Sequence, residues 1–235
     1  MKQINKYICD HFENGKFSIL ERLHINKDTT NYYNYHPKTR DELKKLLDKL
    51  IEERGYNADL NDIDTSEITD MNYMFYKSKF NGDISNWDVS KVKDMSYMFY
   101  GSSFNGDISN WNVSNVEIMD SMFYHSKFNG DISNWDVSNV EDMSYMFGLS
   151  VFNGDISNWV VSNVKDMNSM FYKSKFNGDI SKWNVSNVED IEGMFAMSKF
   201  NRDISKWDVS NVKDMGATFY KSPLQKNPPK WYYKR

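Results

Sequence analysis

The sequence has a single cysteine, Cys9, so neither a disulfide framework nor a cysteine-based metal site is expected. Phosphate-binding glycine loops and nucleophile elbows are also missing. The few histidines are scattered, and no two have the i, i+4 spacing of a metal-binding helix: His11, His24, His36 and His125. These gaps predict a chain with no metal, no cofactor and no catalytic residues, and therefore a protein that is not an enzyme.

Long apolar runs are absent as well, although 40% of the residues are hydrophobic. No stretch is long enough to span a bilayer, and the N-terminus lacks the apolar segment of a signal peptide. We therefore expect no membrane contact and, for the chain as written, a cytoplasmic location, with a surface or virion location as the alternative. The net charge of −4 gives no basic stripe, so nucleic acid is not expected as a partner.

Most of the chain consists of one motif of 24 residues, which is present in seven near-copies between Tyr56 and Pro223. The clearest copy extends from Phe80 through Phe99. Two sets of residues, which we call columns, recur at intervals of 24 residues without any insertion: Asp83, Asp107, Asp131, Asp155, Asp179 and Asp203, and Trp87, Trp111, Trp135, Trp159, Trp183 and Trp207. A period this strict predicts a solenoid, in which each turn buries its apolar face only against its neighbours.

Two periodicities alternate within each repeat. Ile84, Trp87 and Val89 follow the L-x-x-L-x-L pattern of a leucine-rich-repeat strand. Ser90 can then cap a short helix, because the apolar side chains over 92–99 fall on one helical face. We therefore predict an α/β fold, a right-handed leucine-rich-repeat-like solenoid of seven turns. Each turn is expected to hold a short parallel strand, a short helix and a return loop.

The ends of the repeat region are predicted to be covered by caps, because an end turn otherwise leaves its core open to water. An amphipathic helix is expected over 40–54, with Thr39 as its N-cap and Gly55 at its end. At the other end, Trp231 falls one period after the last tryptophan of the repeats. The chain therefore divides into an N-terminal cap over 1–55, the seven turns over 56–223 and a C-terminal cap over 224–235.

The repeat Phe-Asn-Gly-Asp-Ile-Ser-Asn-Trp-Asp-Val-Ser-Asn-Val-x-Asp-Met-x-x-Met-Phe closely resembles that of the BspA-like leucine-rich-repeat surface proteins. This unit is also known as a mycoplasma-type repeat of unknown function. The resemblance covers residues 56–223, and the preceding helix looks like the family's usual lead-in. It implies a leucine-rich-repeat-like solenoid with a binding role, often at cell surfaces, and it carries over no catalytic residues. The chain departs from the surface pattern in lacking a signal peptide, a lipobox cysteine and a wall anchor, so a phage- or virus-encoded copy is an alternative.

Several polar residues recur in every repeat, and a residue repeated so often is expected to serve the backbone rather than a catalytic site. The recurring Asn, Asp and Ser side chains are therefore predicted to form an asparagine ladder and Asx and Ser turns. Bound Ca²⁺ is the alternative use of the aspartate column. The Gly-Gly-x-Gly-x-Asp motif of calcium β-rolls is absent, however, which favours the structural interpretation.

Function in such an array is expected along an exposed column or where the copies differ. The first candidate surface is the polar, exposed face of the predicted strands: Asn86, Asp88, Asn110, Asn112, Asn134, Asp136 and Asn158. The second is an apolar break in the repeat, where Leu149, Val151 and Val160 replace polar residues of the other copies. A solvated face and drift among the copies are the respective alternatives.

We therefore predict a non-enzymatic protein-interaction module that presents a repeat-built surface to a protein partner, with a glycan as the alternative ligand. The alternative from another class is a structural component of a virion, fibre or surface layer that self-associates through the ends or faces of the solenoid. The chain is expected to be a monomer, whereas self-association would favour the assembly role.

Overall fold

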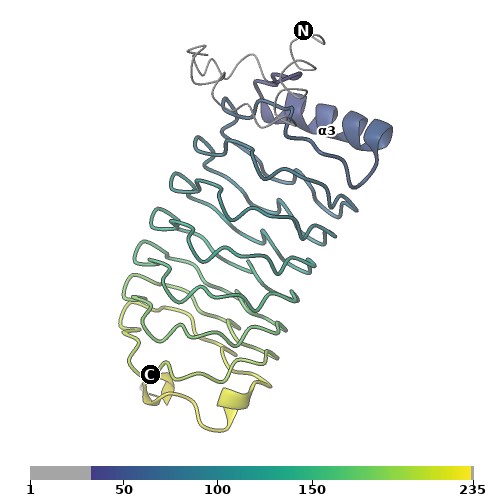
Figure 1. Ribbon diagram of the computed structural model, residues 1–235. Helices are drawn as coiled ribbons and strands as arrows, with labels where there is room; N and C mark the ends of the chain where they lie inside the picture. The colour runs from purple at the N-terminus through teal and green to yellow at the C-terminus, as the bar shows by residue number, and fades with distance from the viewer. Residues whose placement is uncertain (1–32, 234–235) are drawn as a thin grey trace, which may run out of the picture. The chain divides into compact units, whose positions relative to one another are not determined.

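The computed structural model describes residues 33–233. The chain divides into two compact units, Met1–Tyr33 and Asn34–Arg235, and the repeats lie in the second. Of the two predicted caps, residues 1–32 and 234–235 lie outside the described part. The described helices are α3 (Arg40–Arg54) and the 3₁₀ turns η2 (Pro223–Gln225) and η3 (Lys230–Tyr233) (Figure 1). No helix among these residues is long and apolar enough to cross a bilayer.

Helix α3 begins and ends where the sequence predicts. The Thr39 side chain accepts a hydrogen bond from the Glu42 N–H at 3.2 Å, which satisfies one of the free N–H groups of the first turn. At the other end Gly55 has a φ of 89° and closes the helix. One stripe of the helix is buried: Leu43, Leu47 and Leu50. These side chains join the core of the repeats.

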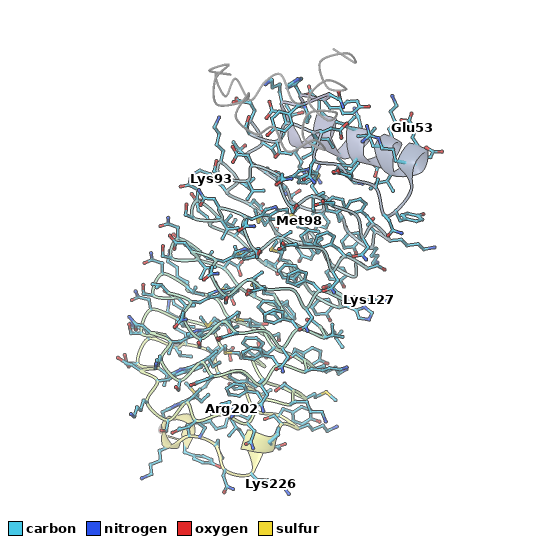
Figure 2. All side chains as sticks on the ribbon, in the orientation of Figure 1. Glu53, Lys93, Met98, Lys127, Arg202 and Lys226 are labelled. Carbon is cyan, nitrogen blue, oxygen red and sulfur yellow. The ribbon has the colours of Figure 1, made fainter. Side chains whose placement is uncertain are left out.

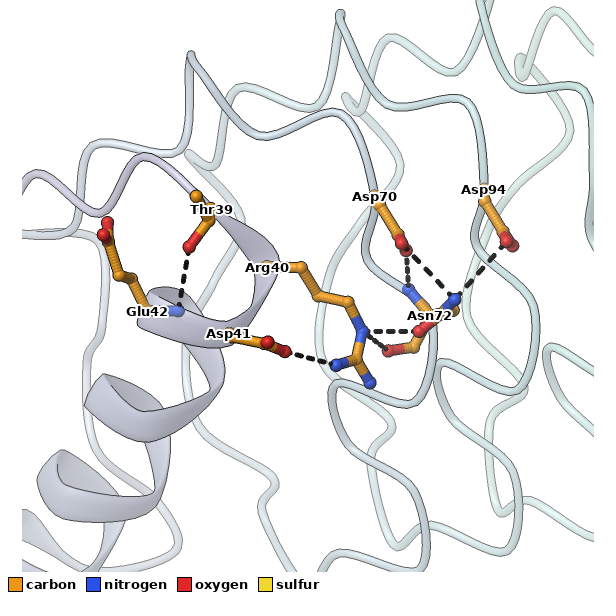
Figure 3. Close-up of polar contacts among 7 residues, drawn as sticks. All are labelled: Thr39, Arg40, Asp41, Glu42, Asp70, Asn72 and Asp94. Atoms are coloured by element: carbon orange, nitrogen blue, oxygen red, sulfur yellow. Dashed lines mark hydrogen bonds and ion pairs between the residues drawn. The ribbon is translucent and has the colours of Figure 1, made fainter.

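Arg40, the first residue of α3, ties the helix to the first repeat. Its Nε donates to the backbone carbonyl of Asn72 at 3.0 Å, and its guanidinium also contacts Asp41 at 2.8 Å. The Asn72 side-chain amide donates in turn to Asp70 and Asp94, at 3.4 and 3.5 Å (Figure 3). One chain of polar contacts therefore links the helix to the first two repeats.

Successive repeats are joined by a parallel backbone ladder in their second halves, and Figure 1 shows the turns side by side. Between each two successive repeats, which we call a joint, the N–H groups of alternate residues of one repeat donate to backbone carbonyls of the next. In the second repeat the donors are Met95, Tyr97, Phe99 and Gly101, at distances of 2.7 to 2.9 Å. Isolated parallel bridges recur at one position of each repeat, beginning with Asp70 and Asp94.

The second half of each repeat is a series of tight turns where the sequence predicts a short helix, and no residue over 56–222 is helical. The cause is a pair of left-handed residues, four positions apart, in every repeat, such as Tyr97 with a φ of 57° and Gly101 with a φ of 62°. A right-handed helix cannot continue through a positive φ. The other N–H groups instead close turns three residues back, as from Met98 to Met95 at 3.2 Å.

The ladder also falls outside the segment from Ile84 to Val89, which the sequence predicts as the strand. There, side chains join neighbouring repeats. The indole N–H of Trp111 donates to the Ile84 carbonyl at 3.2 Å, and equivalent bonds recur along the whole tryptophan column. Because a buried indole needs a partner for its N–H, this bond allows the tryptophans to be only 3% to 8% exposed.

Aromatic rings form the continuous core of the array. The column that starts at Phe75 and ends at Phe219 stacks with centroid distances of 5.4 to 5.9 Å. Trp87 and Trp111 stack at 6.4 Å with parallel rings. In Figure 2 Met98 lies among these buried side chains, whereas charged residues such as Lys127 point outward. Each repeat therefore completes the core of its neighbours.

The recurring polar side chains serve the backbone, which confirms the structural interpretation of these columns. The Asn129 Oδ1 accepts the N–H of Asn153 at 2.8 Å, and the same bond links every asparagine of the column from Asn81 to Asn201. Asp131 accepts the N–H of Ser133 at 2.9 Å, and this bond lowers the pKa of the carboxyl from its ordinary value. The columns therefore hold each bend in place.

The residues after Pro223 extend the core by one step, as the period of Trp231 predicts. Trp231 stacks on Trp207 at 6.4 Å, and its indole N–H donates to the Ile204 carbonyl at 2.9 Å. Tyr232 meets the ring of Phe219 edge-on at 5.1 Å. The turns η2 and η3 therefore cover the core of the last repeat.

Candidate partner-binding site

The polar residues singled out by the sequence all occupy exposed positions: Asn86, Asp88, Asn110, Asn112, Asn134, Asp136 and Asn158. They are of two kinds. Asp88, Asn112 and Asp136 each accept the backbone N–H two residues on, at 3.0 to 3.2 Å. The side chains of the other four form no hydrogen bond with any part of the chain that the structure describes. One column is therefore used by the backbone, and the other is available to a partner.

Val160 occupies the column of Asp136 and Asn184, and it is 55% exposed. Valine has no acceptor for the N–H of Ser162, so Val160→Asp should restore the missing bond. We expect the substitution to raise the free energy of unfolding by about 0.5–1 kcal/mol, the usual net value of one such bond. Urea unfolding followed by circular dichroism measures it. Val160→Ala is the control, and equal stability of the two variants would contradict the expectation.

Leu149 and Val151 stand in the return loop rather than in the column of Val160. Leu149 is half-buried, has a φ of 54°, and donates its N–H to the Tyr172 carbonyl at 2.6 Å. Val151 is 37% exposed. The apolar break therefore spreads over two regions of the repeat, and its loop part adjoins a group of tyrosines.

These tyrosines form two neighbouring columns, which we call the tyrosine face. The first column holds Tyr73, Tyr97 and Tyr145, and the second holds Tyr76, Tyr100, Tyr124, Tyr172 and Tyr220. Tyr73 stacks on Tyr97 at 4.7 Å, and Tyr100 lies 5.0 Å from Tyr76 and 4.9 Å from Tyr124. Tyr73, Tyr76 and Tyr145 are each 39% exposed. The rings are therefore fixed by each other while part of their surface faces solvent.

The tyrosine face leads into a hollow, because small residues replace tyrosine in the later repeats. Ser169, Gly193 and Ala217 continue the first column, and Ala196 interrupts the second. The hollow has a volume of about 270 Å³, and its larger lining residues are Tyr145, Tyr172, Tyr220, Met197, Asn168 and Glu192. Its walls are aromatic, and it carries one amide and one carboxylate side chain. The Oδ1 atom of Asn168 is buried without a hydrogen-bond partner.

Gly148 makes room for one of the rings. A Cβ atom at this position would lie 2.8 Å from the Tyr124 ring, which is closer than side chains tolerate. Tyr124 meets Tyr145 edge-on at 6.1 Å. The loss of a tyrosine in this copy therefore lets the ring from the previous repeat lie across the gap. The break that the sequence marks at Leu149 shapes the tyrosine face through its neighbour Gly148.

The comparisons with known proteins give one family. The family described as Mycoplasma protein of unknown function, DUF285, matches residues 44–150 and 126–232, which together extend from α3 into η3. The chain belongs to this family. The match confirms the mycoplasma-type repeat that the sequence resembles, and the description assigns no activity to it. No curated protein and no solved structure matches the chain.

Next to the tyrosine face, this DUF285 chain carries partly buried carboxylates. Burial raises the pKa of Asp166, and the charges of Asp142 and Asp190 in adjacent repeats raise it further. Burial likewise raises the pKa of Asp120. Burial and the hydrogen bond to Asp120 raise the pKa of Tyr97 to about 12. The Tyr97 hydroxyl therefore stays neutral at physiological pH. Within 33–233 no group of three His, Cys, Asp or Glu side chains could hold a metal ion.

The raised pKa of Asp166 makes stability depend on pH. The folded chain binds this proton more tightly than the unfolded chain does, so the contribution of Asp166 to stability increases as pH falls through its folded pKa. We expect Asp166→Asn to raise the free energy of unfolding at pH 7, by up to about 1 kcal/mol from relieved like-charge repulsion. The gain should shrink as pH falls toward the ordinary aspartate value of 3.8, which urea unfolding at several pH values measures.

Asp131→Asn is the matched control, because its carboxyl has a lowered pKa and contributes stability only above the ordinary aspartate value. This variant should gain nothing at pH 7. A similar gain from both substitutions would contradict the role of burial at Asp166.

Sequence reasoning noted Leu149 but missed the tyrosine face. The signal was present, because tyrosine recurs in both columns and gives way to Gly148, Ser169, Gly193 and Ala196 in the same part of the chain. What concealed it was the predicted helix, because helices of neighbouring repeats pack about 8–10 Å apart. The backbone ladder instead brings the rings of the second column to 4.9 to 5.0 Å from one another, and rings of the first column lie tilted beside them.

Proposed function

We propose that this protein is a non-catalytic, protein-binding scaffold whose partner contacts the tyrosine face. One observation carries the proposal: tyrosines occupy two adjacent columns, stack on one another and keep part of each ring exposed. Tyrosine offers a large contact area and a hydroxyl group at a small cost in conformational entropy, so it is enriched at protein interfaces. Stacking holds the rings in place before a partner arrives, which reduces that cost further.

The hollow at the end of the face would accept one anchoring side chain of the partner. Interfaces draw most of their affinity from a few side chains that fill such pockets. The rings of Tyr145, Tyr172 and Tyr220 supply apolar contact, and Asn168 and Glu192 supply polar groups that orient the ligand. A glycan is the competing ligand, because aromatic rings beside an amide and a carboxylate also suit a sugar.

We further propose that the repeats form a right-handed solenoid of the leucine-rich-repeat type, related to the BspA-like proteins. The inter-repeat ladder and the ring columns support this, since each repeat buries its apolar side chains against the next one. In such arrays the residues that differ between repeats provide specificity. The replacements around Gly148 and Gly193 are of this kind.

The decisive experiment compares two surfaces of the same folded chain. The face variant carries Tyr73→Ser, Tyr76→Ser and Tyr145→Ser, which remove exposed rings. The control variant carries Asn110→Ser, Asn134→Ser and Asn158→Ser, which alter the free polar column. Each is used to capture partners from native cell extract by cross-linking, with mass spectrometry as the readout. We expect a protein that the parent chain and the asparagine variant retain and that the tyrosine variant loses by at least tenfold.

The opposite pattern, with loss only in the asparagine variant, would place the contact on the polar column instead. A third variant, Leu149→Lys with Val160→Asp, tests the apolar break, and unchanged capture would exclude it. Binding of the tyrosine variant at the parent level would refute the proposal. Circular dichroism of each variant verifies that the repeats remain folded.

A further inference from the structure

The backbone ladder has an unpaired edge in the last repeat. In every preceding repeat four alternate N–H groups donate to the next one. Their equivalents here are Met215, Ala217, Phe219 and Lys221. The Lys221 N–H donates to the side-chain carbonyl of Gln225 at 2.6 Å. The other three have no acceptor within residues 33–233. We call these three donors the C-terminal edge.

The C-terminal edge keeps the conformation of a paired one. Ala217 and Lys221 have φ values of 53° and 52°, close to the 60° and 58° of Gly193 and Met197 in the preceding, paired repeat. Ala217 is exposed and Met215 is partly exposed, whereas Phe219 is 1% exposed and is covered by Trp231 and Tyr232, so Met215 and Ala217 are the donors that a partner can reach. The donors are therefore already arranged as in the internal joints, and an added strand would not have to order them.

At each end of the ladder, a side chain forms the hydrogen bond to one backbone group that has no neighbouring repeat. Arg40 donates to the Asn72 carbonyl in the first repeat, and Gln225 accepts from Lys221 in the last. The Gln225 side-chain carbonyl is chemically equivalent to a peptide carbonyl. It therefore shows that the N–H groups of this segment can donate to such an acceptor. At the first repeat, the carbonyls that a second copy would offer to the edge lie beside α3, which is held there by Arg40. A second copy is therefore poorly suited to fill the edge.

The charge around the edge indicates the partner's composition. Lys221, Lys226 and Lys230 lie in the segment over 215–233, which contains no aspartate or glutamate; Asp214 directly precedes this segment, and its carboxylate accepts the Gly216 N–H at 2.9 Å. A row of unpaired N–H groups is a template for an additional strand, and backbone bonds with complementary charge give such strands affinity. We propose that the C-terminal edge binds an acidic segment of a protein partner, which adopts the turns of a repeat and adds to the ladder as one further turn.

The chain itself supplies a probe. A synthetic peptide with the sequence of residues 186–197 contains Glu189, Asp190 and Glu192 and no basic residue. In the intact protein its carbonyls accept the ladder bonds of the preceding repeat, for example from Met167 and Ser169. The measurement is amide hydrogen exchange of the full chain by nuclear magnetic resonance, with and without the peptide. We expect exchange at Met215 and Ala217 to slow at least tenfold on saturation.

Two matched controls separate the contributions of backbone and charge. A peptide with lysine at its three acidic positions should bind at least tenfold more weakly. In the protein, Lys221→Glu, Lys226→Glu and Lys230→Glu together should weaken binding about tenfold, as expected for a few rim charges. The same charge reversal at Lys127, Lys175 and Lys199, which lie in another column, should leave binding unchanged.

Three outcomes would overturn the proposal: protection of the edge amides in the free chain, peptide-induced changes confined to the tyrosine face, or equal binding by the two peptides. Protection that grows with protein concentration, together with dimers in sedimentation, would assign the edge to a second copy instead. Ala217 also lines the hollow of the tyrosine face, so slowed exchange at Met215, which does not line it, separates pairing at the edge from binding in the hollow. Tyr73→Ser and Tyr145→Ser should leave peptide binding intact.

Discussion

Trp135→Ala is expected to lower the free energy of unfolding by about 3–5 kcal/mol, the usual cost of removing a large aromatic side chain from a core. The indole is 4% exposed, its N–H donates to the Ile108 carbonyl at 3.1 Å, and its ring lies 6.3 Å from Phe123. The substitution leaves a cavity between two repeats and removes the indole bond, so the Ile108 carbonyl keeps only the N–H of Trp111, at 3.2 Å. Urea unfolding, followed by far-ultraviolet circular dichroism, measures the loss.

The position of Trp135 in the middle of the array matters as much as its size. Stability in a repeat array is approximately a sum over neighbouring interfaces, so a defect in the middle uncouples the two sides. Trp231→Ala is the matched control, because Trp231 makes the same kind of bond but has a neighbour on one side only. It should cost less, at or below the lower end of the same range. A larger loss from Trp231→Ala would contradict this account.

His125→Pro is expected to lower the free energy of unfolding by about 3 kcal/mol or more, whereas His125→Gly should raise it by up to about 1 kcal/mol. His125 is exposed and has a φ of 52°, and its N–H donates to the Gly148 carbonyl at 2.8 Å. Proline cannot adopt this φ and removes the ladder bond. Glycine adopts it without strain, as Gly101 does at the same position of the previous repeat.

Lys127→Gly is the control for the gain. Lys127 is also exposed and lies in the same loop, but it does not have a positive φ. Glycine there only adds freedom to the unfolded chain and should cost about 0.5–1 kcal/mol. The midpoint of urea unfolding gives both values. If His125→Gly were destabilising to the same extent as Lys127→Gly, the left-handed conformation would not be a source of strain.

Much of the fold could be predicted because each column repeats one physical requirement. A tryptophan at every step needs a partner for its N–H, and the carbonyl of the preceding repeat is at the same place each time. The same holds for the asparagine ladder around Asn129. The helix over 40–54 could be predicted equally well, because Thr39 marks its start and the leucine stripe marks its buried side.

The second half of the repeat could not be predicted in the same way. Its apolar residues have a spacing that suits a helical face. The side chains of Tyr97 and Ser121 are not of a type that predicts a positive φ. The inter-repeat ladder selects that conformation, since it takes every second N–H away from local bonding. The tyrosine face was missed for the same reason. The turn geometry, which is a property of neighbouring repeats together, decides which columns become a surface.

The asparagine ladder also affects how readily its side chains deamidate. An asparagine followed by glycine is prone to deamidation, because the next backbone nitrogen attacks the side-chain carbonyl. This chain repeats that pair in its interior, at Asn81, Asn105, Asn129, Asn153 and Asn177. Each of these carbonyls is held by the N–H of the following repeat, so the reaction requires the ladder to open. The first and last repeats have Ala58 and Arg202 in place of the glycine, so the pair is confined to repeats that have a neighbouring repeat on both sides.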